Sequence, residues 1–501
     1  MERASELATR RLPVNGRKAA SAAGPSRGFS RDSGDGSDRD SGDGSDRDSG
    51  EGSDRDSGDG SDRDSGDESD RDSGDGSDRD SGDESDRDSG DGSDRDPWAT
   101  GATMTFRFTT AGESHGRGLV AILEGIPAGL PVPTERINAE LKRRMGGYGR
   151  GARMKIESDQ IEWLAGVRAG ETLGSPIAML VWNRDWEHWR DVMAPEADAA
   201  GTERRRQVTR PRPGHADLAG SLKYDREDAR DILERASARE TVARVACGAV
   251  CKLLLEQFGI EIGSHVVELG GVKAGVGAQH AAPLPIPSPL NEAADASPVR
   301  CLDRDAEGEM IARIDAAKAA GDTLGGVVEV VALGAPVGLG SHVSWDRKLD
   351  GRLAQALMSI PAVKGVELGL GFEAARRKGS EVHDEILPGL ARATNRAGGT
   401  EGGMTTGEPL VLRVAMKPIS TLMAPLKTVD LKTGAPAQAQ SERSDVTAVP
   451  AMGVIAEAMV ALVLAQAMLE KFGGDALSEM KRNVAGYLAQ VRARTPKGAA
   501  S

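Results

Sequence analysis

After residue 104, hydrophobic and polar residues follow two different periodicities. Short runs rich in Val, Ile and Thr, bounded by Gly or Pro, predict strands in the segments TFRFTT, GLVAILEGI, SPIAMLVWN, SHVVELGGV, GGVVEVVALGAPVG and PLVLRVAMKPI. Apolar residues that recur every three or four positions predict helices within residues 133–147, 237–258, 350–358 and 450–472. These elements do not follow a repeating βαβ order, so the pattern favours an α+β fold with antiparallel sheets.

Residues with capping chemistry mark the ends of the predicted helices. Thr134 is expected to cap the first helix, and Gly146 to stop it. Ser237 and Glu240 have the S-x-x-E spacing of a capping box, which predicts the start of the clearest helix. The last long helix is expected to end at Gly473.

The first part of the chain lacks any such pattern. Residues 31–94 are eight tandem octapeptides of the form RDSGDGSD, with no aliphatic or aromatic side chain. A segment without apolar surface to bury cannot offset the entropy lost on ordering, so we expect a disordered leader over residues 1–103. Calcium binding is a weak alternative, because the repeats lack the apolar residue per turn of a calcium-binding β-helix. Met104 is an alternative start of the translated chain.

Composition changes this picture little. The formal net charge of −14 comes from the octapeptides, which alone carry −18, while residues 97–501 sum to zero. Three cysteines without a CxxC motif favour a reducing compartment. The N-terminus has no apolar signal core, and no run of 18 apolar residues occurs, so we expect a soluble, cytoplasmic protein without a membrane partner.

The segment TAGESHGRG contains a G-x-S-x-G pattern that admits two interpretations. In serine hydrolases this pattern presents a nucleophile between a strand and a helix. Here a second predicted strand follows, so we interpret the motif as a glycine-framed turn that exposes His115, not as an elbow for Ser114. A surface histidine without a function is the remaining alternative.

A second histidine, His215, occupies another constrained turn in the segment RPRPGHADLAG. Arg212 precedes it and Asp217 follows it. Two histidines in rigid turns favour general acid catalysis, because imidazole titrates near neutral pH. A metal site is a weaker hypothesis, since the chain has no HxxxH motif and no Cys/His cluster.

Arginines concentrate in glycine-rich segments and at a helix start. They are Arg143, Arg144, Arg150, Arg153, Arg235, Arg239 and Arg443. Guanidinium groups beside free helix N–H groups predict a small ligand with several negative charges. The net-neutral domain does not favour nucleic acid, and no GxGxxG opens a βαβ unit, so a Rossmann cofactor site is not supported.

Tryptophans at helix-like spacing occur in the segment WNRDWEHW. We expect Trp182, Trp186 and Trp189 to have a packing role instead of a catalytic one.

Nine segments, in order and spanning about residues 104–475, resemble the chorismate synthase family. They are AGESHGRGL, RRMGGYGRGARM, GSPIAMLVWNRDWEHW, RPGHADLAG, RASARETVARVACGA, MSIPAVKGVELGLGF, GGTEGGMTTGEPL, KPISTL and RSDVTAVPA. The resemblance implies a β-α-β sandwich core with antiparallel sheets, in a catalytic domain over residues 104–480. Residues 481–501 would then be a helix end and a flexible tail.

The resemblance also implies an activity. It is the 1,4-trans elimination of phosphate from 5-enolpyruvylshikimate 3-phosphate to give chorismate, the last step of the shikimate pathway. The family requires reduced FMN and forms homotetramers. Whether NADPH reduces the flavin on the enzyme itself, or a separate flavin reductase does so, stays open.

Residue roles follow from the same motifs. The resemblance implies that His115 protonates reduced flavin, His215 protonates the departing phosphate and Asp445 relays the C6 proton. It implies flavin binding by Arg235, Ala236, Ser237, Pro361, Ala362, Gly402, Lys417, Pro418, Ile419, Ser420, Thr421 and Arg443. Arg144 and Arg150 match positions associated with NADP or substrate anions. Ala236 and Pro361 replace the family's usual polar residues, which removes side-chain contacts there.

Overall fold

The computed structural model describes residues 106–151, 158–196, 206–275, 289–441 and 445–494. All of them belong to the second of two units of the chain, Asp94–Ser501. The proposed leader, Arg153 and Arg443 lie outside the described residues.

Two antiparallel sheets form the outer layers of this unit. The first has the order β1-β2-β6-β3, with strands β1 (Arg107–Ala111), β2 (Gly118–Glu124), β6 (Ile177–Trp182) and β3 (Glu162–Ala165). The second has the order β10-β13-β9-β7-β8, with strands β10 (Val363–Leu368), β13 (Leu410–Met416), β9 (Gly326–Leu333), β7 (Glu261–Leu269) and β8 (Val272–Lys273). The predicted strands and their antiparallel pairing are therefore confirmed.

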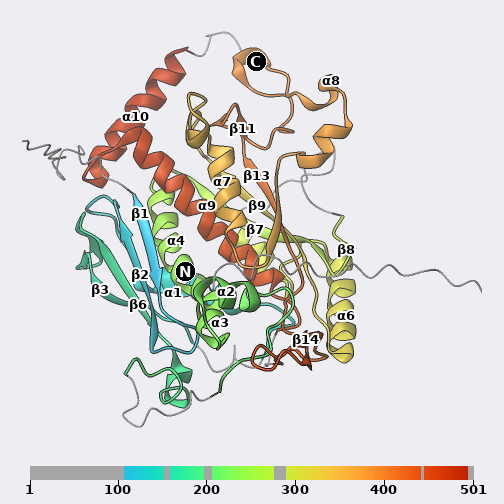
Figure 1. The fold of residues 1–501 in the computed structure, drawn as a ribbon. Helices are drawn as coiled ribbons and strands as arrows, with labels where there is room; N and C mark the ends of the chain where they lie inside the picture. The colour runs from blue at the N-terminus through green and yellow to red at the C-terminus, as the bar shows by residue number, and fades with distance from the viewer. Residues whose placement is uncertain (1–105, 152–157, 197–205, 276–288, 442–444, 495–501) are drawn as a thin grey trace, which may run out of the picture. The chain divides into compact units, whose positions relative to one another are not determined.

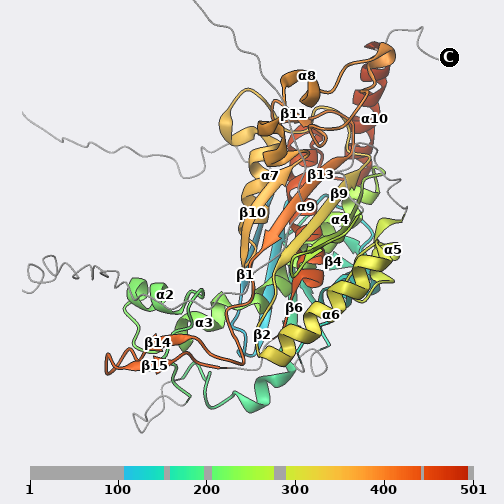
Figure 2. The same ribbon diagram turned by 90° about the vertical axis from the view of Figure 1, so that its right-hand side faces the viewer.

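A layer of helices separates the two sheets (Figures 1 and 2). Its members are α1 (Thr134–Met145), α4 (Thr241–Glu256), α7 (Leu349–Met358) and α9 (Val449–Phe472). Helix α4 packs on β1 and β2, α9 packs on β7 and β9, and the two helices pack on each other. This arrangement confirms the expected β-α-β sandwich.

The remaining elements lie outside this sandwich or extend its ends. The other helices are α2 (Asp217–Tyr224), α3 (Arg230–Ala236), α5 (Leu290–Asp295), α6 (Arg304–Ala320), α8 (Gly379–Val382) and α10 (Leu477–Arg494). Short hairpins are β4 (Val167–Arg168) with β5 (Glu171–Thr172), β11 (Thr400–Glu401) with β12 (Met404–Thr405), and β14 (Lys427–Val429) with β15 (Pro436–Gln438). The 3₁₀ turns are η2 (Arg184–His188), η3 (Ala238–Glu240), η4 (Trp345–Arg347), η5 (Gly371–Arg376) and η6 (Pro388–Leu390). The expected boundary at residue 480 falls inside α10.

The predicted helix caps are only partly right. Gly146 ends α1 as expected, but Thr134 is the first helical residue and its hydroxyl accepts a hydrogen bond from Trp163 Nε1 at 2.9 Å. Ser237 Oγ accepts the Arg239 N–H at 3.3 Å and so caps the 3₁₀ turn that leads into α4.

The second half of the predicted capping box does not form. The Glu240 carboxylate pairs with Arg244 at 2.8 Å, one helical turn further along. An ion pair at this spacing competes with the reciprocal bond of Glu240 to the Ser237 backbone.

Helix α9 is apolar around its whole circumference. By length and composition it could cross a membrane, but 89% of its most apolar window is buried inside the protein. Helices hydrophobic on all sides occur in the cores of large domains as well as in membranes. The burial of α9 between the sheets identifies it as the core helix.

One charged residue, Glu457, lies in the middle of α9 and is fully buried. Its carboxylate accepts hydrogen bonds from Arg143 at 2.9 and 3.0 Å, from Lys252 at 2.6 Å and from Arg300 at 3.0 Å. Ser264 on β7 donates another at 2.6 Å. Burial raises the pKa of Glu457, but the neighbouring cations outweigh burial and hold this pKa well below its usual range. One carboxylate thus connects α1, α4, α9 and β7.

Replacing Glu457 by Gln should lower the free energy of unfolding by about 3–5 kcal/mol, because three buried cations lose a counter-charge. Since the folded protein lowers the pKa of Glu457, its contribution is fully present above the unfolded pKa of about 4.3. The contribution is lost as the pH falls through the folded value. Urea denaturation at neutral pH measures the difference.

Glu470→Gln is the matched control on the same helix. Glu470 pairs with Arg352 at 2.7 Å and is 44% exposed, so its loss should cost less than about 1 kcal/mol. Equal losses for the two variants would contradict the assigned role of Glu457.

Candidate active site

His115 lies in the turn between β1 and β2, docked against α3. The Ser114 N–H donates to the Glu234 carbonyl at 2.9 Å. The His115 N–H donates to Glu234 Oε2 at 2.8 Å, and His115 Nδ1 lies 2.9 and 3.0 Å from the two carboxylate oxygens. A strand follows the turn, which confirms the strand–turn–strand interpretation of the GESHG motif. The serine-hydrolase alternative has no support, since its elbow requires a helix there.

Glu234 is buried and ionised. Arg230 Nη1 donates to Glu234 Oε1 at 2.9 Å, one turn away on α3. Burial raises the pKa of Glu234, but hydrogen bonds and charges from His115 and Arg230 outweigh it and lower this pKa. An ionised carboxylate only accepts hydrogen bonds, so Nδ1 of His115 carries a proton.

Trp189 stacks on the His115 ring, with ring centroids 3.9 Å apart and planes at 27°. The guanidinium carbons of Arg206 and Arg230 lie 4.5 and 4.9 Å from its ring centroid. Trp189 therefore packs against an expected site residue, and its packing role stays a prediction. Trp182 is 44% exposed and its indole N–H donates to Glu162.

Buried polar residues form hydrogen bonds that hold the backbone of the GESHG turn. Asn183 Nδ2 donates to the carbonyls of Gly116 and Glu113 at 2.7 and 3.2 Å, and its Oδ1 accepts from Arg239 Nε at 2.9 Å. Arg239 Nη1 donates to Asp159 at 2.6 Å. Asn183 therefore ties the turn to the start of α4.

His215 forms a second imidazole–carboxylate pair. Its Nδ1 lies 2.5 Å from Asp217 Oδ1, and Arg212 holds the same carboxylate through Nε at 2.8 Å. Burial raises the pKa of Asp217, but the hydrogen bonds from His215 and Arg212 hold this pKa well below its usual range. The His215 side chain is 19% exposed, so the ring can be reached from outside.

The KPIST segment lies against the His215 turn. Lys417 Nζ donates to Ser420 Oγ at 2.8 Å, and Ser420 Oγ donates to the Gly214 carbonyl at 2.8 Å. Arg212 Nη1 donates to Thr421 Oγ1 at 2.9 Å. The structure thus brings two expected site segments together, although they are about two hundred residues apart in the chain.

The backbone of the KPIST segment also forms hydrogen bonds with its surroundings. Thr323 Oγ1 donates to the Ile419 carbonyl at 2.8 Å, and Lys417 Nζ lies 3.3 Å from the Pro418 carbonyl. The Lys417 N–H donates to the Ala362 carbonyl at 3.0 Å, which places the Pro361–Ala362 turn beside this segment. Ala362 has a φ of 70°, an unusual conformation for a residue with a side chain.

Asp445 and Arg150 also meet. Arg150 Nη1 lies 3.1 Å from Asp445 Oδ2, and the Gly151 N–H donates to Asp445 Oδ1 at 2.5 Å. Arg144, in contrast, is buried and donates to Thr241 Oγ1 at 2.9 Å and to the Ala238 carbonyl at 2.8 Å. Burial lowers the pKa of Arg144 to about 9.

Three further expected residues lie at the end of α3, beside the GESHG turn. The exposed Arg235 donates to the Thr110 carbonyl and hydroxyl at 2.8 and 2.7 Å, while Ser237 Oγ donates to Ser114 Oγ at 3.1 Å. Ala236 ends α3 between them. Gly402 forms the turn between β11 and β12, and no contact connects it to either histidine within the described part of the chain.

Sequence reasoning missed the partners of the histidine site. Glu234, Trp189 and Asn183 contact His115 or its turn, and Arg206 and Arg230 contact Trp189. The only local signal was the position of Glu234 directly before Arg235, and adjacency alone does not reveal a contact across 119 residues.

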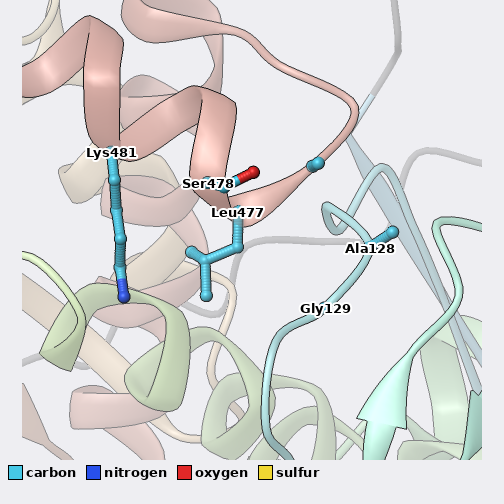
Figure 3. Close-up of a pocket in the computed structure, with 6 residues that line it drawn as sticks. Ala128, Gly129, Leu477, Ser478 and Lys481 are labelled. Carbon is cyan, nitrogen blue, oxygen red and sulfur yellow. The ribbon is translucent and has the colours of Figure 1, made fainter.

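A hollow of about 420 Å³ lies elsewhere, at the start of α10 (Figure 3). It is lined by Ala128, Gly129, Ala476, Leu477, Ser478 and Lys481. It contains none of the expected site residues, and Lys481 already donates to Gln257 at 2.9 Å. Within the described ranges, no group of three or more His, Cys, Asp or Glu could hold a metal ion.

Comparison with known proteins identifies the class. Residues 106–469 match the model of the family described as chorismate synthase. The chain is 61% identical over 391 residues to chorismate synthase from Salinispora tropica, covering 76% of this chain and 98% of that protein. It is 60% identical, with the same coverage, to chorismate synthase from Streptomyces coelicolor.

A solved structure agrees. A crystal structure described as chorismate synthase matches with a TM-score of 0.62 and 46% identity, over 78% of this chain and 100% of the other. Fold and relatives together define a carbon–oxygen lyase that acts on a phosphate. The chain belongs to the chorismate synthase family, whose members serve chorismate and aromatic amino-acid biosynthesis.

Replacing Asn183 by Ala should destabilise the protein by about 1–3 kcal/mol, because two carbonyls and Arg239 lose a buried partner. Turnover should fall as well, since the turn that carries His115 loosens. Urea denaturation measures the loss of stability, and steady-state kinetics measure the fall in turnover. Asn483→Ala removes one partly buried hydrogen bond from α10 to the Phe472 carbonyl at the end of α9, and it should leave turnover unchanged. A fall in turnover for both variants would contradict the assignment.

Proposed function

We propose that this site converts 5-enolpyruvylshikimate 3-phosphate to chorismate by 1,4-trans elimination of phosphate, with reduced FMN as the required cofactor. The observation that carries the proposal is the pair of histidines, each with Nδ1 on a buried carboxylate. Basic side chains surround both. The substrate carries two carboxylates and one phosphate, so it matches this positive surface.

The residues present suit a flavin with a phosphate tail. Within the described part of the chain, no carboxylate pairs with Lys417, whose pKa is lowered by burial and by the charge of Lys364. A cation in that state gains from an added anion. Lys417, Ser420 and Thr421 would hold the phosphate, and the loops of Arg235, Ala236, Ser237, Pro361, Ala362, Gly402 and Arg443 would border the rest.

Reduced flavin, when bound, would supply the transient electron donation that lets a poorly acidic C–H bond break. His215 is suited to protonate the departing phosphate. Asp217 holds its Nδ1, so proton delivery falls to Nε2 on the partly exposed side of the ring. Arg212 helps to keep Asp217 ionised, so this carboxylate accepts a hydrogen bond from Nδ1.

His115 has the same arrangement and is suited to hold a proton beside the flavin. Asp445 would accept the C6 proton, with Arg150 keeping its carboxylate oriented at 3.1 Å. Arg144 would not bind anions directly, because its guanidinium donates to Thr241 and Ala238. It would instead hold the start of α4 in place beside the ligand.

We further propose a cytoplasmic homotetramer. Apolar side chains near His215 are exposed in the single chain. Such a patch is typical of a surface that a neighbouring subunit covers in an oligomer. These side chains are Leu218, Leu222, Tyr224, Met423, Leu426 and Val429. NADPH on the enzyme, or an external flavin reductase, would keep the flavin reduced.

The direct test is anaerobic release of phosphate and formation of chorismate from the substrate with pre-reduced FMN. His115→Ala and His215→Ala should each lower turnover by about two to four orders of magnitude, the range for lost acid–base catalysis. His342→Ala, at an exposed position away from both turns, should leave turnover unchanged. Wild-type protein that forms no chorismate under these conditions would overturn the proposal.

Removing residues 1–103 should leave both folding and turnover intact, since the expected site lies wholly in later residues. Thermal denaturation and the same anaerobic assay compare the two chains. A loss of turnover without a loss of stability would assign the acidic repeats a catalytic contribution and contradict the domain division.

A further inference from the structure

We propose that Glu234 is a positioning residue that fixes the tautomer and orientation of His115, so that only Nε2 exchanges a proton with a bound ligand. The proposal rests on the proposed function of His115 in proton transfer. The contact of Glu234 with the imidazole does not depend on that function.

Glu234 holds His115 at more than one point. Both carboxylate oxygens lie within 3.0 Å of Nδ1, and one of them also accepts the His115 backbone N–H at 2.8 Å. The Glu234 carbonyl accepts the Ser114 N–H at 2.9 Å. Backbone and ring are therefore fixed by the same residue, which leaves the imidazole little freedom to rotate.

The charge state of Glu234 determines the tautomer. The side chain of Glu234 is 2% exposed, and Arg230 donates to it at 2.9 Å. Arg230 is itself held by the Arg206 carbonyl at 2.8 Å. A carboxylate kept ionised in this way accepts hydrogen bonds and cannot donate one, so the proton stays on Nδ1 and the lone pair of neutral imidazole stays on Nε2.

The other neighbours of the ring support this geometry. Trp189 covers one face of the imidazole at 3.9 Å, while the cations of Arg206 and Arg230 lie by the indole. The guanidinium groups lie against Trp189, whereas the Glu234 carboxylate lies against Nδ1 itself, so this carboxylate favours a proton on Nδ1.

His215 has the same arrangement, in which a buried carboxylate contacts Nδ1 of the ring. Asp217 lies 2.5 Å from its Nδ1 and is held by Arg212. In both cases a buried carboxylate, itself paired with an arginine, takes Nδ1. The repetition at two separate turns argues that the contact serves proton transfer and not local packing alone.

The test compares Glu234→Gln with Glu234→Ala in the full-length protein. The Gln side chain can still accept from Nδ1, whereas Ala cannot. In ¹⁵N spectra of protein labelled in its seven histidines, the His115 signal is assigned by its loss in His115→Ala. Wild type and E234Q should show the Nδ1–H tautomer, and E234A should show mainly Nε2–H, the usual form of free imidazole.

Kinetics provide the second readout. We expect kcat to fall about 10-fold or more in E234Q and about 100-fold or more in E234A, with KM for the substrate changed less than about 3-fold. In a His115→Ala background, E234A should lower kcat by only a further few-fold, because Glu234 acts through His115.

Glu240→Gln is the matched control. Glu240 is also buried and paired with an arginine, Arg244, but it does not contact His115 among the described contacts. The E240Q variant should be less stable than the wild type but should leave the ¹⁵N signal of His115 unchanged.

Two results would overturn the proposal. One is an Nε2–H tautomer in the wild type, and the other is an unchanged His115 signal in E234A. A protein that forms no chorismate but shows the expected tautomers would refute the proposed function and leave this inference standing.

Discussion

The buried carboxylate of Glu457 is the constraint around which the helix layer is arranged. An ion in the protein interior costs several kcal/mol unless it is paired and hydrogen-bonded. The cations that pair with Glu457 come from α1, from α4 and from the segment after α5, while β7 contributes a hydroxyl. Apolar packing alone would allow α9 to slide along its neighbours. The ionic contacts define one position for it between the sheets.

The same requirement for paired buried charge builds the support of the active site. Asp159 has a fully buried side chain, and Arg239 donates to its Oδ1 at 2.6 Å, while Arg144 Nη1 lies 3.7 Å from its Oδ2. Arg239 also reaches Asn183, which holds the carbonyls of the GESHG turn. The start of α4 is therefore connected to the turn that carries His115. These polar contacts connect the helices around Glu457 to the GESHG turn.

The two histidines of the candidate site are each held by a buried carboxylate. Their carboxylate partners lie on α2 and α3, two short helices outside the sandwich. Each helix holds a loop through one imidazole, so the orientation of the ring is restricted. Lys417 and its neighbours border the same region without a carboxylate partner among the described residues, which leaves positive charge for an anionic ligand. Fixed donors beside unpaired cations suit the elimination of phosphate.

Local patterns in the sequence determined the elements of this protein. Strand alternation, helical periodicity and the glycines around His115 act over a few residues, so most strands, the four helices between the sheets and the strand–turn–strand context were predictable, whereas the long helices α6 and α10 were not predicted. Tertiary structure decided which side chains meet. Thr134 binds an indole instead of capping its helix, Trp189 stacks on His115, and Glu234 reaches that histidine across 119 residues. A hydrogen bond depends on distance and direction in space, and no local periodicity encodes a contact between segments so far apart.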